Sequence, residues 1–135
     1  MPLIVEFLLP RAPVSHQAKS SETKRLWRDY IYGRAMQVWP TKPLVDCDLK
    51  FTMVYLAEDD EVGDINNYVK PVQDALCSLI YADDAMVVDI SAHFRVSASQ
   101  SWAGLPELLE LALQSGEPCV YVAISDSGDL AEEIS

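Results

Sequence analysis

Cysteine and histidine are scarce in this chain of 135 residues. The three cysteines, Cys47, Cys77 and Cys119, lie far apart, and no Cys-x-x-Cys pair occurs. An odd number of separated cysteines argues against a disulfide framework and against a thiolate zinc site, and it favours a reducing compartment. With only His16 and His93 available, a histidine-based zinc site is not expected either.

Long apolar runs are also absent. No stretch approaches the ~20 apolar residues that a membrane-spanning helix needs. The first nine residues lack the basic segment of a signal peptide and are too short for one, so they are interpreted as a strand. These absences predict a cytoplasmic protein with no membrane partner.

Basic residues are absent after Arg95, although the chain holds ten in total against 21 acidic residues, a net charge of −11. Residues 1–42 contain seven basic and three acidic side chains, whereas residues 96–135 contain seven acidic and no basic ones. A polyanion such as DNA would therefore approach the N-terminal part while the acidic end points elsewhere. An acidic protein with ordinary charge asymmetry is the alternative interpretation.

Periodic apolar residues separated by proline, glycine and acidic turns predict seven elements. Strands are expected at residues 2–9, 46–57, 86–96 and 118–125, and helices at residues 21–38, 64–81 and 105–114. The order β-α-β-α-β-α-β predicts a single α/β (α+β) domain over residues 1–125, with helices packed on a small mixed sheet. Residues 126–135 are predicted to be an acidic, disordered tail.

Two local features of the predicted helices bear on function. Ser21 is expected to cap the first helix, on which Lys24, Arg25 and Arg28 share a polar face that is either a DNA-contacting surface or an ordinary solvated face. In the second helix Pro71 has no N–H, so the carbonyl of Asn67 loses its helical partner. Either the first turn is irregular or that oxygen has another use.

The segment from Gly63 to Asp84 concentrates oxygen-bearing side chains. Asp64 is placed as a helix N-cap, the amides of Asn66 and Asn67 follow, and Asp83 and Asp84 stand in a turn after the helix. Carboxylate and amide oxygens suit a hard divalent cation. A lysine nearby, Lys70, suits a phosphate or a developing negative charge. The combination favours metal-assisted phosphodiester hydrolysis.

Spacing alone does not bring Asp64 and Asp84 together. A helix of about 17 residues would separate its ends by about 25 Å. The two carboxylates meet only if the chain folds back along the helix or if a second subunit supplies the partner.

The sequence DINNYVKPVQDAL at residues 64–76, followed by YADDAMVV at residues 81–88, resembles the RusA family of Holliday-junction resolvases. The family pattern is Asp-x-Asp-Asn-x-x-Lys, then Asp-Ala-Leu, then Asp-Asp before a valine-rich strand. Several fixed spacings agree at once over residues 64–89, about a fifth of the chain.

The resemblance implies a RusA-like fold and a homodimer that cleaves branched DNA, the four-way junctions of recombination and repair, with Mg²⁺. It implies metal ligands at Asp64, Asn66 and Asp84, and catalytic roles for Asp64, Lys70 and Asp84. Lys24, Arg25, Arg28 and Arg95 are then the candidate contacts to the DNA backbone.

One position departs from the family pattern. The second aspartate of the motif is Asn66 here, and an amide oxygen ligates Mg²⁺ without bringing negative charge. Two further hypotheses therefore stand beside a junction-cleaving nuclease. One is a RusA-like module that binds junctions but cleaves weakly or not at all, and the other is an acidic protein-interaction domain.

The same residues also have structural interpretations. Asp64 is an ordinary helix cap in many sequences, Asp83-Asp84 is a common turn, and Lys70 is placed to pair with Asp74 one helical turn on.

Overall fold

The computed structural model describes residues 3–40, 42–60, 64–96 and 103–134. Its strands are β1 (Leu3–Leu9), β2 (Leu49–Ala57), β3 (Val87–Val96) and β4 (Cys119–Asp126). Its α-helices are α1 (Ser21–Val38), α2 (Asn66–Leu76), α3 (Glu107–Ser115) and α4 (Leu130–Ile134), and a 3-10 turn, η1, covers Asp84–Met86. Among the helices described, none has the length and apolar character needed to cross a bilayer.

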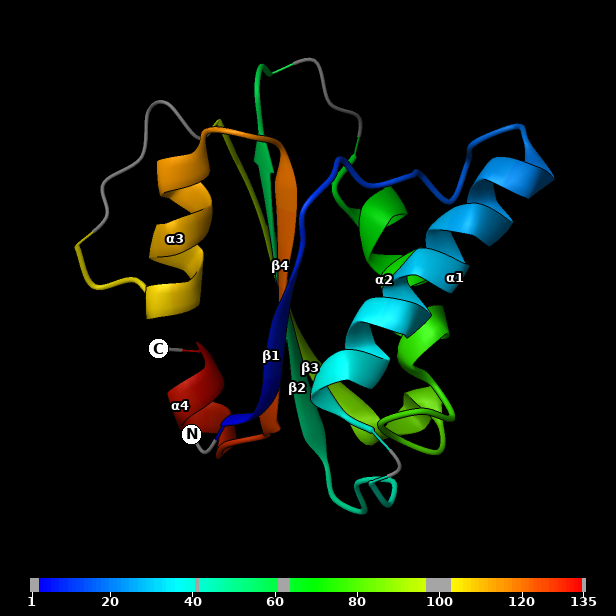
Figure 1. The fold of residues 1–135 in the computed structure, drawn as a ribbon. Coiled ribbons are helices and arrows are strands. Elements are labelled where there is room, and N and C mark those ends of the chain that lie inside the picture. The colour runs from blue at the N-terminus through cyan, green and yellow to red at the C-terminus, as the bar shows by residue number, and fades with distance from the viewer. Residues whose placement is uncertain (1–2, 41, 61–63, 97–102, 135) are drawn as a thin grey trace.

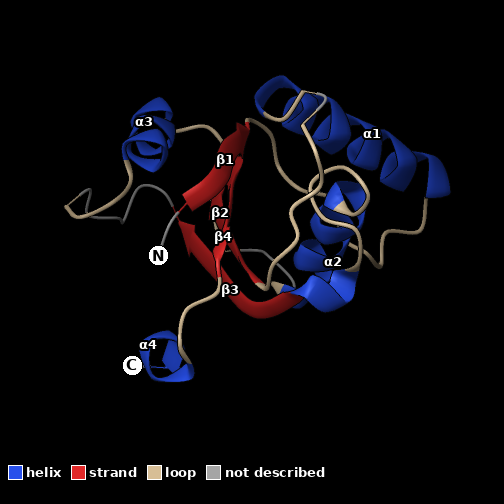
Figure 2. Cartoon of the chain, turned by 90° about the horizontal axis from the view of Figure 1, so that it is seen from below, coloured by secondary structure: helices blue, strands red, loops and turns tan. Residues whose placement is uncertain are grey.

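The four strands form one mixed sheet in the order β1-β4-β2-β3. β4 is antiparallel to both β1 and β2, whereas β2 and β3 are parallel. Helices α1 and α2 cover one face, and α3 and α4 lie on the other side (Figures 1 and 2). Because β2 and β3 are parallel, α2 and the segment after it form the crossover that connects them.

The main core lies between the sheet and helices α1 and α2. Alternate side chains of β2, including Phe51 and Met53, meet Trp27 and Ile31 of α1 and a stripe of α2. The other face carries a smaller cluster in which Leu56 of β2 packs with residues of β4 and α3. Most apolar burial thus fixes α1 and α2 on the sheet, and these two helices carry most of the predicted site residues.

The predicted α+β domain with a small mixed sheet and the predicted element order are confirmed. Two local predictions are wrong. The first helix is capped by Ser20, whose hydroxyl accepts a hydrogen bond from the Thr23 amide, and not by Ser21, which is its first residue. The strand expected from residue 46 begins at Leu49.

The second helix is also shorter than predicted. It begins at Asn66 and ends at Leu76, and the Asp64 carboxylate caps its start by accepting a hydrogen bond from the Asn66 amide. Cys77 adopts an extended backbone and Ser78 a positive φ of 73°, which stops a helix. The apolar residues as far as Tyr81 continue the helical pattern, but they are buried by a turn in the chain.

That turn sends the chain back toward α2. The Ser78 amide donates to the Tyr81 carbonyl at 2.7 Å, and the Val45 amide donates to the Ile80 carbonyl, also at 2.7 Å. Ile80 and Tyr81 are fully buried. The Tyr81 hydroxyl donates to the Gln73 carbonyl of α2 at 2.9 Å. Burial and hydrogen bonding together hold residues 77–83 against the helix.

Residues 126–135 include the end of β4 and helix α4. Glu133 of α4 forms an ion pair with Lys50 of β2 at 3.2 Å, and its side chain is only 6% exposed. The Ser127 hydroxyl donates to the Asp89 carboxylate on the same side of the sheet. Disorder of this segment in solution stays a prediction.

The Tyr81 hydroxyl gives a test of the turn. Tyr81→Phe removes one hydrogen bond in a buried setting, and we expect the free energy of unfolding to fall by about 1 kcal/mol. Urea denaturation followed by circular dichroism measures the change. Tyr32→Phe, at an exposed tyrosine of α1, is the control, and equal stability of the two variants would contradict the assigned role.

Candidate functional site

A polar stripe runs along the exposed face of α2. Asn66, Lys70 and Asp74 are spaced four residues apart, so they lie above one another on one side of the helix. The opposite side is buried through Val69, Val72, Ala75 and Leu76. The apolar pattern of α2 therefore fixes which way the polar stripe points.

Lys70 is the centre of a charge cluster on this stripe. Its Nζ lies 2.9 Å from Oδ1 of Asp74 and 3.6 Å from Oδ2 of Asp84. The three side chains are between 43% and 53% exposed. Asp74, and to a smaller extent Asp84, raises the pKa of the Lys70 ammonium, so this side chain stays cationic. The cluster is open to a ligand from solvent.

Asp84 reaches Lys70 because the chain returns along α2. Within the Asp83-Asp84 pair the two carboxylates have different tasks. Asp83 caps η1, since its Oδ1 accepts a hydrogen bond from the Ala85 amide at 3.0 Å. Asp84, the first residue of η1, is left to face Lys70. The structure therefore separates a structural aspartate from a candidate functional one.

Asp64 lies at the other end of the stripe, just before α2. Its Oδ1 accepts a hydrogen bond from the Asn66 amide at 3.0 Å, and its carbonyl accepts from the Asn67 amide at 3.0 Å. The carboxylate thus starts the helix, as in an Asx turn. Among the described residues no hydrogen bond or ion pair joins Asp64 to Asp84 or to Lys70. The structure brings Lys70 and Asp84 together and leaves Asp64 beside Asn66.

The predicted ligands, Asp64, Asn66 and Asp84, are two carboxylates and one amide. In the part of the chain that the structure describes, no three His, Cys, Asp or Glu side chains are grouped so that they hold a metal ion. The predicted donors are all oxygen atoms on exposed residues, and this chemistry fits a hard divalent cation. Asn66 contributes no charge, so the set is less negative than one of three carboxylates.

The carbonyl of Asn67, released by Pro71, has a partner outside the helix. The His16 amide donates to it at 2.7 Å. Pro71 therefore does not break α2, and the free oxygen fastens the loop that precedes α1 to the helix that carries Lys70. Sequence reasoning identified the free carbonyl but not its partner.

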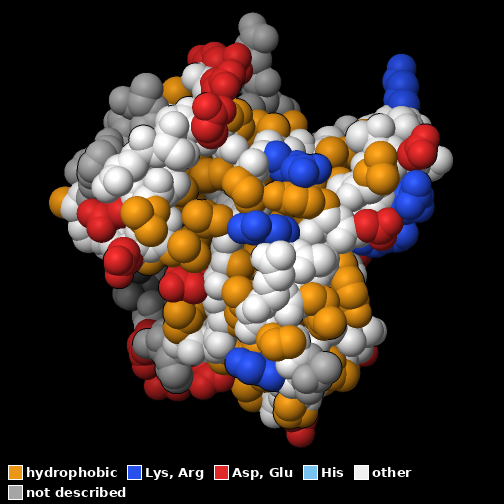
Figure 3. Space-filling view, viewed as in Figure 1, with side chains coloured by type: hydrophobic (Ala, Val, Ile, Leu, Met, Phe, Trp, Pro, Cys, Tyr) orange, Lys and Arg blue, Asp and Glu red, His pale blue; other side chains and the backbone are white. Residues whose placement is uncertain are grey.

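This contact borders a groove between α1 and α2. The cavity measures about 380 Å³ and is lined by Val14, His16, Ser21, Lys24, Arg25, Trp27, Arg28, Pro71 and Asp74. Three predicted DNA contacts, Lys24, Arg25 and Arg28, thus share a cavity wall with Asp74, the partner of Lys70. Figure 3 shows Lys and Arg side chains spread over the face that carries α1, with acidic side chains among and around them.

Ion pairs reduce the positive charge of this groove. Arg25 lies 3.2 Å from Asp29 and 3.6 Å from Glu22, and Arg28 lies 4.0 Å from Asp29. All of these side chains are more than half exposed, so the pairs are weak and exchange readily with another anion.

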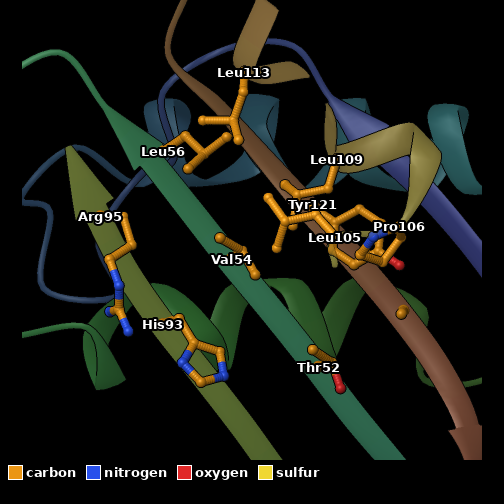
Figure 4. Close-up of a pocket in the computed structure, with 11 residues that line it drawn as sticks. Thr52, Val54, Leu56, His93, Arg95, Leu105, Pro106, Leu109, Leu113 and Tyr121 are labelled. Carbon is orange, nitrogen blue, oxygen red and sulfur yellow. The ribbon is translucent and has the colours of Figure 1, made fainter. Parts of the chain in front are cut away.

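Arg95, the fourth predicted DNA contact, lies on the other face of the sheet. It lines a cavity of about 480 Å³ with His93, Thr52, Val54 and side chains around α3 (Figure 4). In the register of β2 and β3, Arg95 is opposite Leu56, which packs beneath α3. The structure does not bring Arg95 to the groove or to Lys70.

A known protein family matches most of the chain. The family model for endodeoxyribonuclease RusA matches residues 10–124. No curated protein matched the chain in a sequence search. The matched region contains the polar stripe of α2, the turn that carries Asp84 and the basic face of α1. The chain belongs to the RusA endodeoxyribonuclease family.

Proposed function

We propose that this protein is a Mg²⁺-dependent, structure-selective endodeoxyribonuclease that cleaves four-way DNA junctions. Membership of the RusA family supports the endonuclease role. The observation that carries the proposal is the exposed Lys70 ammonium, which pairs with both Asp84 and Asp74. Asp74 also lines the groove that holds three basic side chains. A cationic side chain stabilises the charge that develops on a phosphodiester during cleavage, and oxygen-bearing side chains can hold the metal ion that assists it.

Asp64, Asn66 and Asp84 are the residues that would hold the cation. A bound divalent metal polarises a phosphodiester and lowers the pKa of a water molecule. Lys70 would contact the scissile phosphate and stabilise the charge that develops on its oxygens. A lysine is already protonated at neutral pH, and Asp74 and Asp84 raise the pKa of Lys70 further.

Lys24, Arg25 and Arg28 would bind the DNA backbone along the groove between α1 and α2. Since Asp74 lines the same groove and contacts Lys70, a strand bound there passes next to the proposed catalytic lysine. Arg95 is on the opposite face, so any phosphate that it binds belongs to another part of the junction.

We also propose that the protein acts as a cytoplasmic homodimer in recombination and repair. A four-way junction has two equivalent cleavage positions, and a dimer places one site at each of them. A monomer has a single site and cannot engage both positions at once.

Two features favour a second candidate, a module that binds junctions without efficient cleavage. Asn66 brings no charge to the proposed metal site, and the Lys70 ammonium stands beside Asp84. Both features weaken the attraction for a divalent cation. In this case the groove would bind DNA and the proposed site would hold the cation too weakly to support cleavage.

Two substitutions separate these candidates. For a nuclease, we expect Asp64→Asn to reduce cleavage of a synthetic four-way junction by about 100-fold or more, because it removes a charged ligand. We expect Asn66→Asp to retain or increase cleavage. The measurement is a cleavage time course with Mg²⁺, and Glu117→Gln, an exposed acid beyond α3, is the control for lost charge.

If Asp64→Asn cleaves as fast as the unmodified protein, the metal assignment is wrong. If the unmodified protein binds the junction without cutting it and Asn66→Asp cuts it, the binding module is correct.

The basic groove is tested by salt dependence. A triple variant in which Lys24, Arg25 and Arg28 are all changed to glutamine should bind the junction more weakly. The slope of log K against log salt concentration should become less negative by about one to three. The lower value applies if the ion pairs with neighbouring acids of α1 already neutralise part of the charge. Gel shifts at several salt concentrations measure the slope. Lys50→Gln, on the other side of the sheet and paired with Glu133, should leave the slope unchanged.

A further inference from the structure

The two carboxylates beside Lys70 are not equivalent. Asp74 is on the same helix and lies 2.9 Å from Nζ, whereas Asp84 is on the returning chain and lies at 3.6 Å. Among the described residues these are the only acidic partners of Lys70. The closer partner is therefore a residue with no assigned role in metal binding.

We propose that Asp74 is a positioning residue that keeps the Lys70 ammonium in the site when Asp84 turns to the metal ion. This inference rests on the proposed nuclease function. Asp74 is the permanent partner of the lysine, and Asp84 is the exchangeable one.

The Lys70–Asp74 ion pair contributes little to the stability of the fold. Both side chains are nearly half exposed, and exposed ion pairs at this spacing contribute little to folding stability. The contribution is smaller still when the lysine precedes the acid in the helix, as it does here. Asp74→Asn should therefore fold normally, and any large effect on the site is separate from stability.

Charge competition explains why a second carboxylate is needed. An ammonium beside Asp84 repels a divalent cation and occupies an oxygen that the cation requires. With Asp74 present, the ammonium keeps an anionic partner after Asp84 is withdrawn. Without Asp74, Lys70 has only Asp84 to pair with, so lysine and metal compete for the same carboxylate.

The first test needs no metal and no DNA. In ¹⁵N NMR spectra of lysine side chains, an ammonium held in an ion pair gives a resolved signal with restricted motion. We expect the Lys70 signal to weaken in Asp74→Asn, where only the longer contact to Asp84 remains, to be retained in Asp84→Asn and to be restored in Asp74→Glu. Glu133→Gln, which breaks the Lys50 ion pair, should remove the Lys50 signal and leave that of Lys70. Loss in Asp84→Asn with retention in Asp74→Asn would overturn the proposal.

The second test measures how tightly Mn²⁺ binds to the DNA-free protein by calorimetry. Asp74→Asn should weaken Mn²⁺ binding about fivefold, the scale of one exposed charge pair. In a Lys70→Met background the same substitution should have less than about a twofold effect, because Asp74 acts through the lysine. Equal weakening in both backgrounds would show that Asp74 acts directly on the metal and would overturn the positioning role.

The two proposals fail in different ways. If no variant binds Mn²⁺, the metal assignment of the proposed function is wrong, and the NMR result still decides whether Asp74 or Asp84 holds the lysine. If Mn²⁺ binds and Asp74→Asn changes neither its affinity nor the Lys70 signal, the metal assignment stands and the inference about Asp74 is wrong.

Discussion

The return of the chain along α2 is the constraint on which the candidate site depends. Helix α2 ends at Leu76, and the following turn buries Ile80 and Tyr81 in the core. The Tyr81 hydroxyl then fastens this turn to the Gln73 carbonyl. Apolar burial does most of this, because it is the dominant favourable term in folding. As a consequence Asp84, which lies well beyond the end of α2 in the sequence, comes within ion-pair distance of Lys70.

A strongly acidic chain can still present a site for a polyanion. The net charge of −11 is a property of the whole molecule, whereas a ligand responds to the charges near it. Lys24, Arg25 and Arg28 gather along the groove between α1 and α2, and the acid-rich residues of α3 and α4 lie on the other side of the sheet (Figure 1). The sheet keeps the two regions apart.

Pro71 illustrates how a local defect is used by the fold. Proline removes one hydrogen bond from α2, and the freed Asn67 carbonyl receives the His16 amide instead. The loop before α1 is thereby fixed to the helix that carries Lys70. The basic groove and the charge cluster are therefore parts of one assembly, since α1 and α2 are also joined through the core.

Local sequence determined the elements and the chemistry. Apolar spacing placed the strands and α1 to within a few residues, and the motif at residues 64–76 identified the family and the oxygen-bearing side chains. The predicted end of α2 was too late, because the apolar residues within 77–81 suit a buried turn as well as a helix. The i,i+4 spacing also predicted the Lys70–Asp74 pair. Tertiary structure alone decided that Asp84 meets Lys70 and that Arg95 lies on the opposite face. These are contacts between segments whose relative placement depends on packing of the whole core, which no local pattern encodes.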